Sequence, residues 1–149
     1  TDHPAVRRRP IWSAPMMAVL PIGHPLGRKD RLEPADFHEQ PFVALGAEIS
    51  TRSETDTFLA AGHARPRVVV EAQLSASICE LVASGAGLSI VEPVTAANFA
   101  AAGRVLARPL HPEQPFRYDL LLPALREPSR VATRFLEMVE ARFSDLLGS

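Results

Sequence analysis

Residues 68–93 read VVVEAQLSASICELVASGAGLSIVEP, and this stretch decides the fold. The β-branched run Val68 to Val70 predicts a buried strand that ends at polar residues. Apolar residues at 78, 81 and 82 predict a helix, and two glycines, Gly85 and Gly87, predict its end before a second buried strand at 88–91. A strand, helix and strand of this length indicate a parallel crossover. In such sheets ligands lie at the carboxyl ends of the strands.

Two serines lie where that helix begins. Ser75 and Ser77 can each accept hydrogen bonds from the free amides of a first helical turn. They are interpreted either as helix caps or as a corner that binds an anion, and capping is the commoner role for serine at such a position.

Length and charge exclude several classes of protein. With 149 residues, the chain suits one domain, or one and a half small ones, with a real core. Its 16 basic and 17 acidic side chains nearly cancel, so net charge favours neither nucleic acid nor an anionic membrane as a partner. No apolar run approaches the length of about 20 residues that a membrane span needs. The first residues carry no secretory signal pattern, so we expect a cytoplasmic protein.

Short apolar runs alternate with helical patterns along the rest of the chain. Further strands are predicted at 16–20, 42–45, 105–110 and 118–122, and the strand around Val68 to Val70 spans 67–71. Helices are predicted at 34–39, 52–61, 94–102 and 130–147. This alternation predicts an α/β fold with a largely parallel sheet.

Seven segments in order carry a resemblance to a known family. They are MMAVLP, GHPLG at 23–27, EPADF, PFVAL, STRSETDTFLAAG, VVVEA and SICELVASGAGLSIVEP. Over residues 10–143 the chain resembles the effector-binding domain of LysR-type transcriptional regulators. The segments VVVEAQLSAS and IVEP are most similar to the lysine-biosynthesis activator and the opine-responsive regulators, which sense amino acids or amino-acid conjugates.

The resemblance implies a lobe like those of periplasmic binding proteins, plus a remnant of a second lobe. Residues 1–20 would be a remnant of lobe one with a hinge strand, 21–110 a complete lobe two, and 111–149 a return to lobe one ending in a helix. The strands at 16–20 and 105–110 would then run side by side. The resemblance also implies a homodimer or homotetramer that contacts DNA only through an N-terminal domain missing from this chain.

Three segments follow predicted strands and should converge at one sheet edge. The candidate effector-binding residues there are Ala47, Glu48, Ser50, Gln73, Ser75, Ser77 and Glu92. Backbone amides, a helix N-terminus and serine hydroxyls suit a carboxylate, whereas Glu92 suits an ammonium group. An amino acid carries both groups. Glu48 is an alternative partner for the ammonium, and Glu92 can equally be a solvated carboxylate at a strand end.

Other polar residues have simpler interpretations. Arg52 and Asp56 are spaced as a pair on a helix surface, which we prefer to a ligand-binding role. His24 is expected to order its loop, because no second His or Cys lies at metal-ligand spacing. Cys79 is expected in the core, without an internal disulfide partner. The sequence therefore predicts no metal site and no cofactor.

The leading hypothesis is a regulatory sensor that binds a small metabolite in a cleft. The alternative is a periplasmic-type solute-binding protein for a small polar ligand, which would share the same architecture. We do not expect an enzyme, because the sequence offers no clear acid and base carboxylates, no supported Ser-His-Asp arrangement and no phosphate loop.

Overall fold

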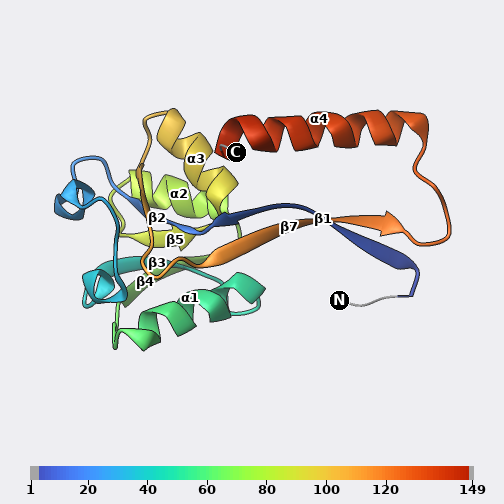
Figure 1. Cartoon of the computed structure of the whole chain (residues 1–149). Coiled ribbons are helices and arrows are strands. Elements are labelled where there is room, and N and C mark those ends of the chain that lie inside the picture. The colour runs from blue at the N-terminus through green and yellow to red at the C-terminus, as the bar shows by residue number, and fades with distance from the viewer. Residues whose placement is uncertain (1–3, 148–149) are drawn as a thin grey trace. The chain divides into compact units, whose positions relative to one another are not determined.

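The computed structural model describes residues 4–147, and their contacts divide the chain into two compact units. One unit is Pro15–Gln114, and the other joins the residues before Pro15 to those after Gln114. The elements, shown in Figure 1, are β1 (Val6–Pro15), β2 (Met17–Leu20), η1 (Pro25–Arg28), η2 (Pro34–Phe37), β3 (Pro41–Leu45), α1 (Ser50–Ala61), β4 (Arg67–Ala72), α2 (Ser75–Ala83), β5 (Ser89–Val91), α3 (Pro93–Ala101), β6 (Leu106–Pro109), β7 (Pro115–Pro123) and α4 (Arg130–Leu147). The division of the sequence at 20/21 and 110/111 stays a prediction.

The unit Pro15–Gln114 is built around a mixed sheet in which β2 runs against its neighbours. β2 pairs antiparallel with β5 on one side and with β6 on the other, whereas β3 and β4 pair in parallel. An isolated parallel bridge between Phe42 and Leu88 joins the two ladders. There the amide of Val43 donates to the Leu88 carbonyl at 2.8 Å, and the amide of Leu88 donates to the Pro41 carbonyl at 2.8 Å. The predicted α/β class and the side-by-side strands at 16–20 and 105–110 are confirmed. The sheet is mixed and not largely parallel, because β2 runs antiparallel to both β5 and β6.

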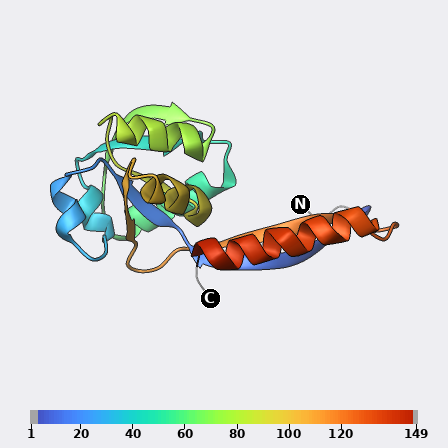
Figure 2. The same cartoon turned by 90° about the horizontal axis from the view of Figure 1, so that it is seen from above.

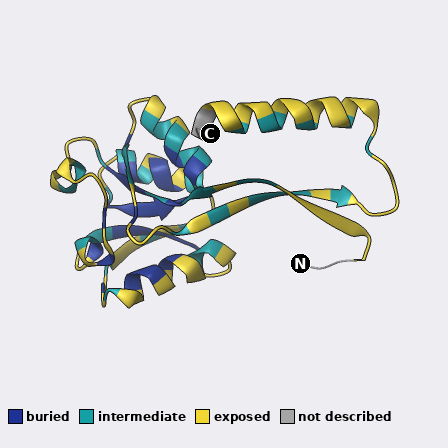
Figure 3. Cartoon of the chain, viewed as in Figure 1, coloured by how far each residue is buried: buried dark blue, intermediate teal, exposed yellow. Residues whose placement is uncertain are grey.

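Helices cover both faces of this sheet (Figures 1 and 2). On one face α2 and α3 bury a cluster against the strands, made of Val19, Val43, Leu45, Ile78, Cys79, Val82, Val91, Ala96 and Val105. On the other face Phe37 of η2 meets Phe42 and Phe58 edge to face, with ring centroids 6.1 and 6.3 Å apart. Figure 3 shows the buried residues concentrated in β2, β3, β5 and the inner sides of the helices. Apolar burial on both faces is the main stabilising term of such a sheet.

The strand at 67–72 differs from the prediction of a buried strand. Val68 and Val69 are 45% and 43% exposed, so that prediction is wrong. The cause is position, because β4 pairs only with β3 among the described residues and so forms a sheet edge. A register shift opposite Phe42 and Val43 places an extra residue in β4, which is a common feature of edge strands.

The other unit consists of the paired strands β1 and β7 together with α4. Tyr118 of β7 packs edge to face on Phe143 of α4, with ring centroids 4.8 Å apart. The predicted helix at 130–147 is confirmed. Part of its apolar stripe faces solvent, since Val131, Phe135 and Met138 are 81%, 63% and 61% exposed. Exposed apolar groups in such a row are typical of a surface that contacts something else.

The substitution Gly87→Ala tests how closely the two ladders approach. A Cβ atom at this position would lie 2.4 Å from the Pro41 carbonyl oxygen, which belongs to the backbone of β3 and cannot rotate away. We expect a loss of about 2 kcal/mol or more in the free energy of unfolding, measured by urea denaturation. The control is Gly103→Ala, since Gly103 also has positive φ but no atom lies within 4 Å of its Cβ position. Equal losses for the two variants would contradict the steric explanation.

Candidate functional site

The carboxyl ends of three parallel strands meet at one edge of the sheet. β3 ends at Leu45, β4 ends at Ala72 and β5 ends at Val91, and a helix begins a few residues after each end. The amide of Gly46 donates to the Ala72 carbonyl at 3.1 Å, so the first two connections are in direct contact. The first two connections therefore converge as expected from the sequence.

A hydrogen bond between two predicted site residues links the first two connections. The side-chain amide of Gln73 donates to the carboxylate of Glu48. Hydrogen bonds from the backbone of Glu48 itself and then from Gln73 hold the pKa of this carboxyl below its ordinary value, because they stabilise the charged form. Both side chains and the neighbouring Ala47 are exposed. The edge thus presents a carboxylate that is ionised at neutral pH.

The two serines at the start of α2 do not cap this helix. α2 has Leu74 at its N-cap position with no side-chain hydrogen bond, so the prediction that Ser75 and Ser77 cap this helix is wrong. The reason is that the helix begins at Ser75, so both serines lie inside its first turn and not at the N-cap position. Among the described residues neither hydroxyl has a hydrogen-bond partner. Ser50 likewise is the first residue of α1 and is exposed.

Glu92 is engaged by the helix that follows it. Its carboxylate accepts hydrogen bonds from the amides of Val94 at 2.8 Å and Thr95 at 3.1 Å, and from the Thr95 hydroxyl. Pro93 occupies the first turn of α3, where its missing amide proton is no loss. The interpretation as a merely solvated carboxylate is therefore wrong, because Glu92 is a half-buried N-cap.

Sequence reasoning missed most of the role of Arg52. Its pairing with Asp56 is confirmed, with Nε 3.0 Å from the carboxylate. In addition, Nη1 donates to the Leu45 carbonyl at 2.6 Å and to Glu71 at 2.9 Å. The hydrogen bond with Glu71 is the main reason that the pKa of Arg52 is raised. Only the i, i+4 spacing to Asp56 could have been read from the sequence.

Other candidate residues stand apart from this edge. His24 accepts a hydrogen bond on Nδ1 from the amide of Leu26 and so orders its loop, as expected. Cys79 is fully buried, and burial, followed by the charges of Glu92 and Glu80, raises the pKa of its thiol to about 12. Within residues 4–147 no group of three His, Cys, Asp or Glu side chains could hold a metal ion. No helix in that range is long and apolar enough to cross a membrane.

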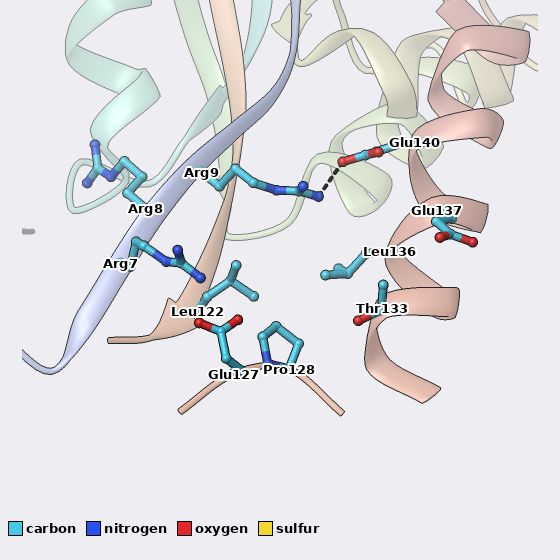
Figure 4. Close-up of a pocket in the computed structure, with 10 residues that line it drawn as sticks. All are labelled: Arg7, Arg8, Arg9, Leu122, Glu127, Pro128, Thr133, Leu136, Glu137 and Glu140. Atoms are coloured by element: carbon cyan, nitrogen blue, oxygen red, sulfur yellow. Dashed lines mark hydrogen bonds and ion pairs between the residues drawn. The ribbon is translucent and has the colours of Figure 1, made fainter. Parts of the chain in front are cut away.

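The unit that contains α4 has a groove of its own, shown in Figure 4. Arg7, Arg9, Leu122, Thr133 and Glu140 are among the residues that line it. Arg9 is paired with Glu140 across the groove, and Arg8 with Asp119 at 3.6 Å. Arg8 and Arg9 are thus held by ion pairs within this unit.

Comparison with known proteins identifies the family. The model of the LysR substrate binding domain matches residues 1–144. The chain belongs to this family. It is 33% identical over 142 residues to the transcriptional activator protein LysR of Escherichia coli K12, covering 95% of this chain and 45% of that protein. It is 28% identical over 134 residues to the regulatory protein NocR of Agrobacterium tumefaciens T37, covering 90% and 44%.

A solved structure supports the fold. The regulatory domain of CcmR from Synechocystis PCC6803, in complex with 2-PG, matches with a TM-score of 0.73 at 18% identity, over 92% of this chain and 66% of that one. The periplasmic-binding-protein-like fold that the LysR resemblance implied is therefore confirmed. The present chain spans less than half the length of the LysR and NocR proteins that it matches.

The substitution Gly46→Ala tests the contact between the two connections. A Cβ atom there would lie 2.7 Å from Nε2 of Gln73 and 2.9 Å from the Glu48 carboxylate, so these flexible side chains must separate. We expect the pKa of Glu48 to rise towards its ordinary value, because a hydrogen bond to the charged form is lost. The free energy of unfolding should change by less than about 1 kcal/mol. An NMR pH titration of the Glu48 side chain checks this.

The matched control is Gln73→Ala, which removes the donor directly and should raise the pKa of Glu48 by a similar amount. A Glu48 titration that neither variant changes would contradict the proposed link.

Proposed function

We propose that this chain is the effector-binding part of a LysR-type DNA-binding transcriptional regulator. It senses a small metabolite, with an amino acid or amino-acid conjugate as the favoured class. DNA is contacted through an N-terminal domain outside this chain, and the protein acts in the cytoplasm without catalysing a reaction. The observation that carries the proposal is the family match over residues 1–144, together with the sheet edge where three helices begin.

The proposed pose of the effector follows from the polar groups at this edge. Its carboxylate lies at Ser75 to Ser77, where the start of α2 offers a favourable dipole and two hydroxyls that form no hydrogen bond with the described residues. Its ammonium points towards Glu92, with Glu48 as a second carboxylate. Ala47, Ser50 and Gln73 complete the contact surface. The lowered pKa of Glu48 supports this pose, since an ionised carboxylate attracts a cation.

The substitution Ser75→Ala tests the carboxylate position. It should leave the fold intact and weaken effector binding by about 1 to 3 kcal/mol, because a hydrogen bond to a charged group is lost. The measurement is calorimetry on the full-length gene product, titrated with amino acids, opines and simple organic acids. Glu92→Gln should weaken the binding of cationic compounds more than that of neutral ones.

Thermal unfolding of the Glu92 variant is the control, since this residue also caps α3. The amino-acid assignment is wrong if organic acids bind as well as amino acids and Glu92→Gln leaves every affinity unchanged.

We also propose that the protein is at least a dimer. The exposed stripe of Val131, Phe135 and Met138 on α4 supports self-association, because apolar side chains lose contact with water when two such surfaces meet. Arg134 and Glu137 form an ion pair beside the stripe. The choice between a dimer and a tetramer stays open in this proposal.

Light scattering at high protein concentration should give a mass of at least a dimer. Phe135→Asp should weaken association by about tenfold or more, because a charge would be transferred from water into an apolar contact. The matched control is Ser144→Asp, which adds the same charge at an exposed position on the other side of the helix. A monomeric mass for the unaltered chain would overturn the assembly proposal.

A further inference from the structure

Arg52 has the largest set of contacts between segments at the candidate site. Its side chain is 18% exposed, although it is a charged residue in the first turn of α1. The guanidinium contacts the Leu45 carbonyl, the Glu71 carboxylate and the Asp56 carboxylate. These three acceptors come from the end of β3, the end of β4 and the body of α1.

Hydrogen bonds fix the loop at 46–49 at both of its ends, and the Arg52 side chain supplies one of them. Before the loop, the Leu45 carbonyl is held by Nη1 of Arg52, and the amide of Gly46 donates to the Ala72 carbonyl. After the loop, the amide of Arg52 donates to the Ile49 carbonyl at 2.9 Å. Within it, the amide of Ile49 donates to the Gly46 carbonyl at 3.0 Å. The loop is therefore a closed turn, and the Arg52 side chain holds the carbonyl of the residue that precedes it.

Glu71 links Arg52 to the second connection, between β4 and α2. It lies two residues before Gln73, which holds Glu48 of the first loop. The ion pair of Arg52 with Glu71 and the hydrogen bond of Gln73 with Glu48 thus join the two connections side by side. The charge of Arg52 is also offset by two carboxylates, so it adds little net attraction for an effector carboxylate.

We infer that Arg52 is the positioning residue of the effector-binding edge: it holds the loop at 46–49 against the connection between β4 and α2, and does not itself bind the effector. That an effector binds at this edge rests on the proposed function, whereas the positioning of the loop does not. The planar fork of arginine suits the task, because it donates in several fixed directions at once. A lysine ammonium has the same charge but not that geometry.

Hydrogen exchange with mass spectrometry tests the inference on the ligand-free protein. In Arg52→Lys we expect the amides of Gly46 and Ile49 to exchange about tenfold faster, because a charge-assisted contact that holds the turn is lost. Amides in β2, β5 and β6 should keep their rates. The matched control is Arg104→Lys, since the Arg104 side chain in the same unit is paired, within residues 4–147, only with the carboxylate of Glu80. That variant should leave the exchange of the loop unchanged.

The possible results separate a positioning role from a general structural one. Unchanged exchange at 46–49, or faster exchange throughout the unit, would overturn the inference. If Arg52→Lys does not fold, Glu71→Gln provides the same test, because it keeps the size of the side chain and removes the ion pair.

Binding to the amino acids of the panel gives a second readout. For those that bind the unaltered protein, Arg52→Lys should weaken affinity by about tenfold at a temperature where both proteins are fully folded. Unchanged affinity despite a loosened loop would also overturn the positioning role. If no amino acid of the panel binds the unaltered protein, the proposed amino-acid assignment fails, while the exchange experiment still decides whether Arg52 positions the loop.

Discussion

Two backbone hydrogen bonds between Leu88 and β3 are the constraint on which the rest of this structure depends. They place β4, β3 and β5 in one parallel arrangement, and β5 in turn pairs with the antiparallel strand β2. Parallel neighbours have their carboxyl ends at the same edge. The approach is so close that the residue before Leu88 has no room for a side chain. A single glycine thus permits the geometry that collects the polar residues of the site.

The helices that begin at this edge differ in whether a side chain caps their first turn. The amides at the start of α3 are already bound to the carboxylate of Glu92, so the positive end of that helix is largely offset. The start of α2 has no side-chain cap, and its serine hydroxyls lack partners among the described residues. The start of α1 likewise has no side-chain cap, so an anionic group is favoured at α1 or α2 over α3.

Sequence patterns predicted the positions of helices and strands well, and the exposure and contacts of single side chains less well. The stripe in α4 and the strands at 16–20 and 105–110 follow from periodicity, which is a local property. The exposure of Val68 and the ion pair of Arg52 with Glu71 depend on which strands become neighbours, and no local pattern contains that information. The capping role of Glu92 could have been predicted from the sequence, because an acidic residue before Pro93 is typical of a helix start. The strand β1 was missed, since its arginines resemble a solvated segment.

The buried thiol of Cys79 gives the molecule an internal reporter. Because Cys79 lies on the buried face of α2 and its thiol has a pKa of about 12, the thiol stays protonated and shielded from alkylating reagents while the helix stays packed. Modification can then proceed only from states in which α2 has separated from the sheet. The rate of thiol labelling therefore measures how often that helix opens, and a compound that binds at its first turn would slow the reaction without touching the sulfur.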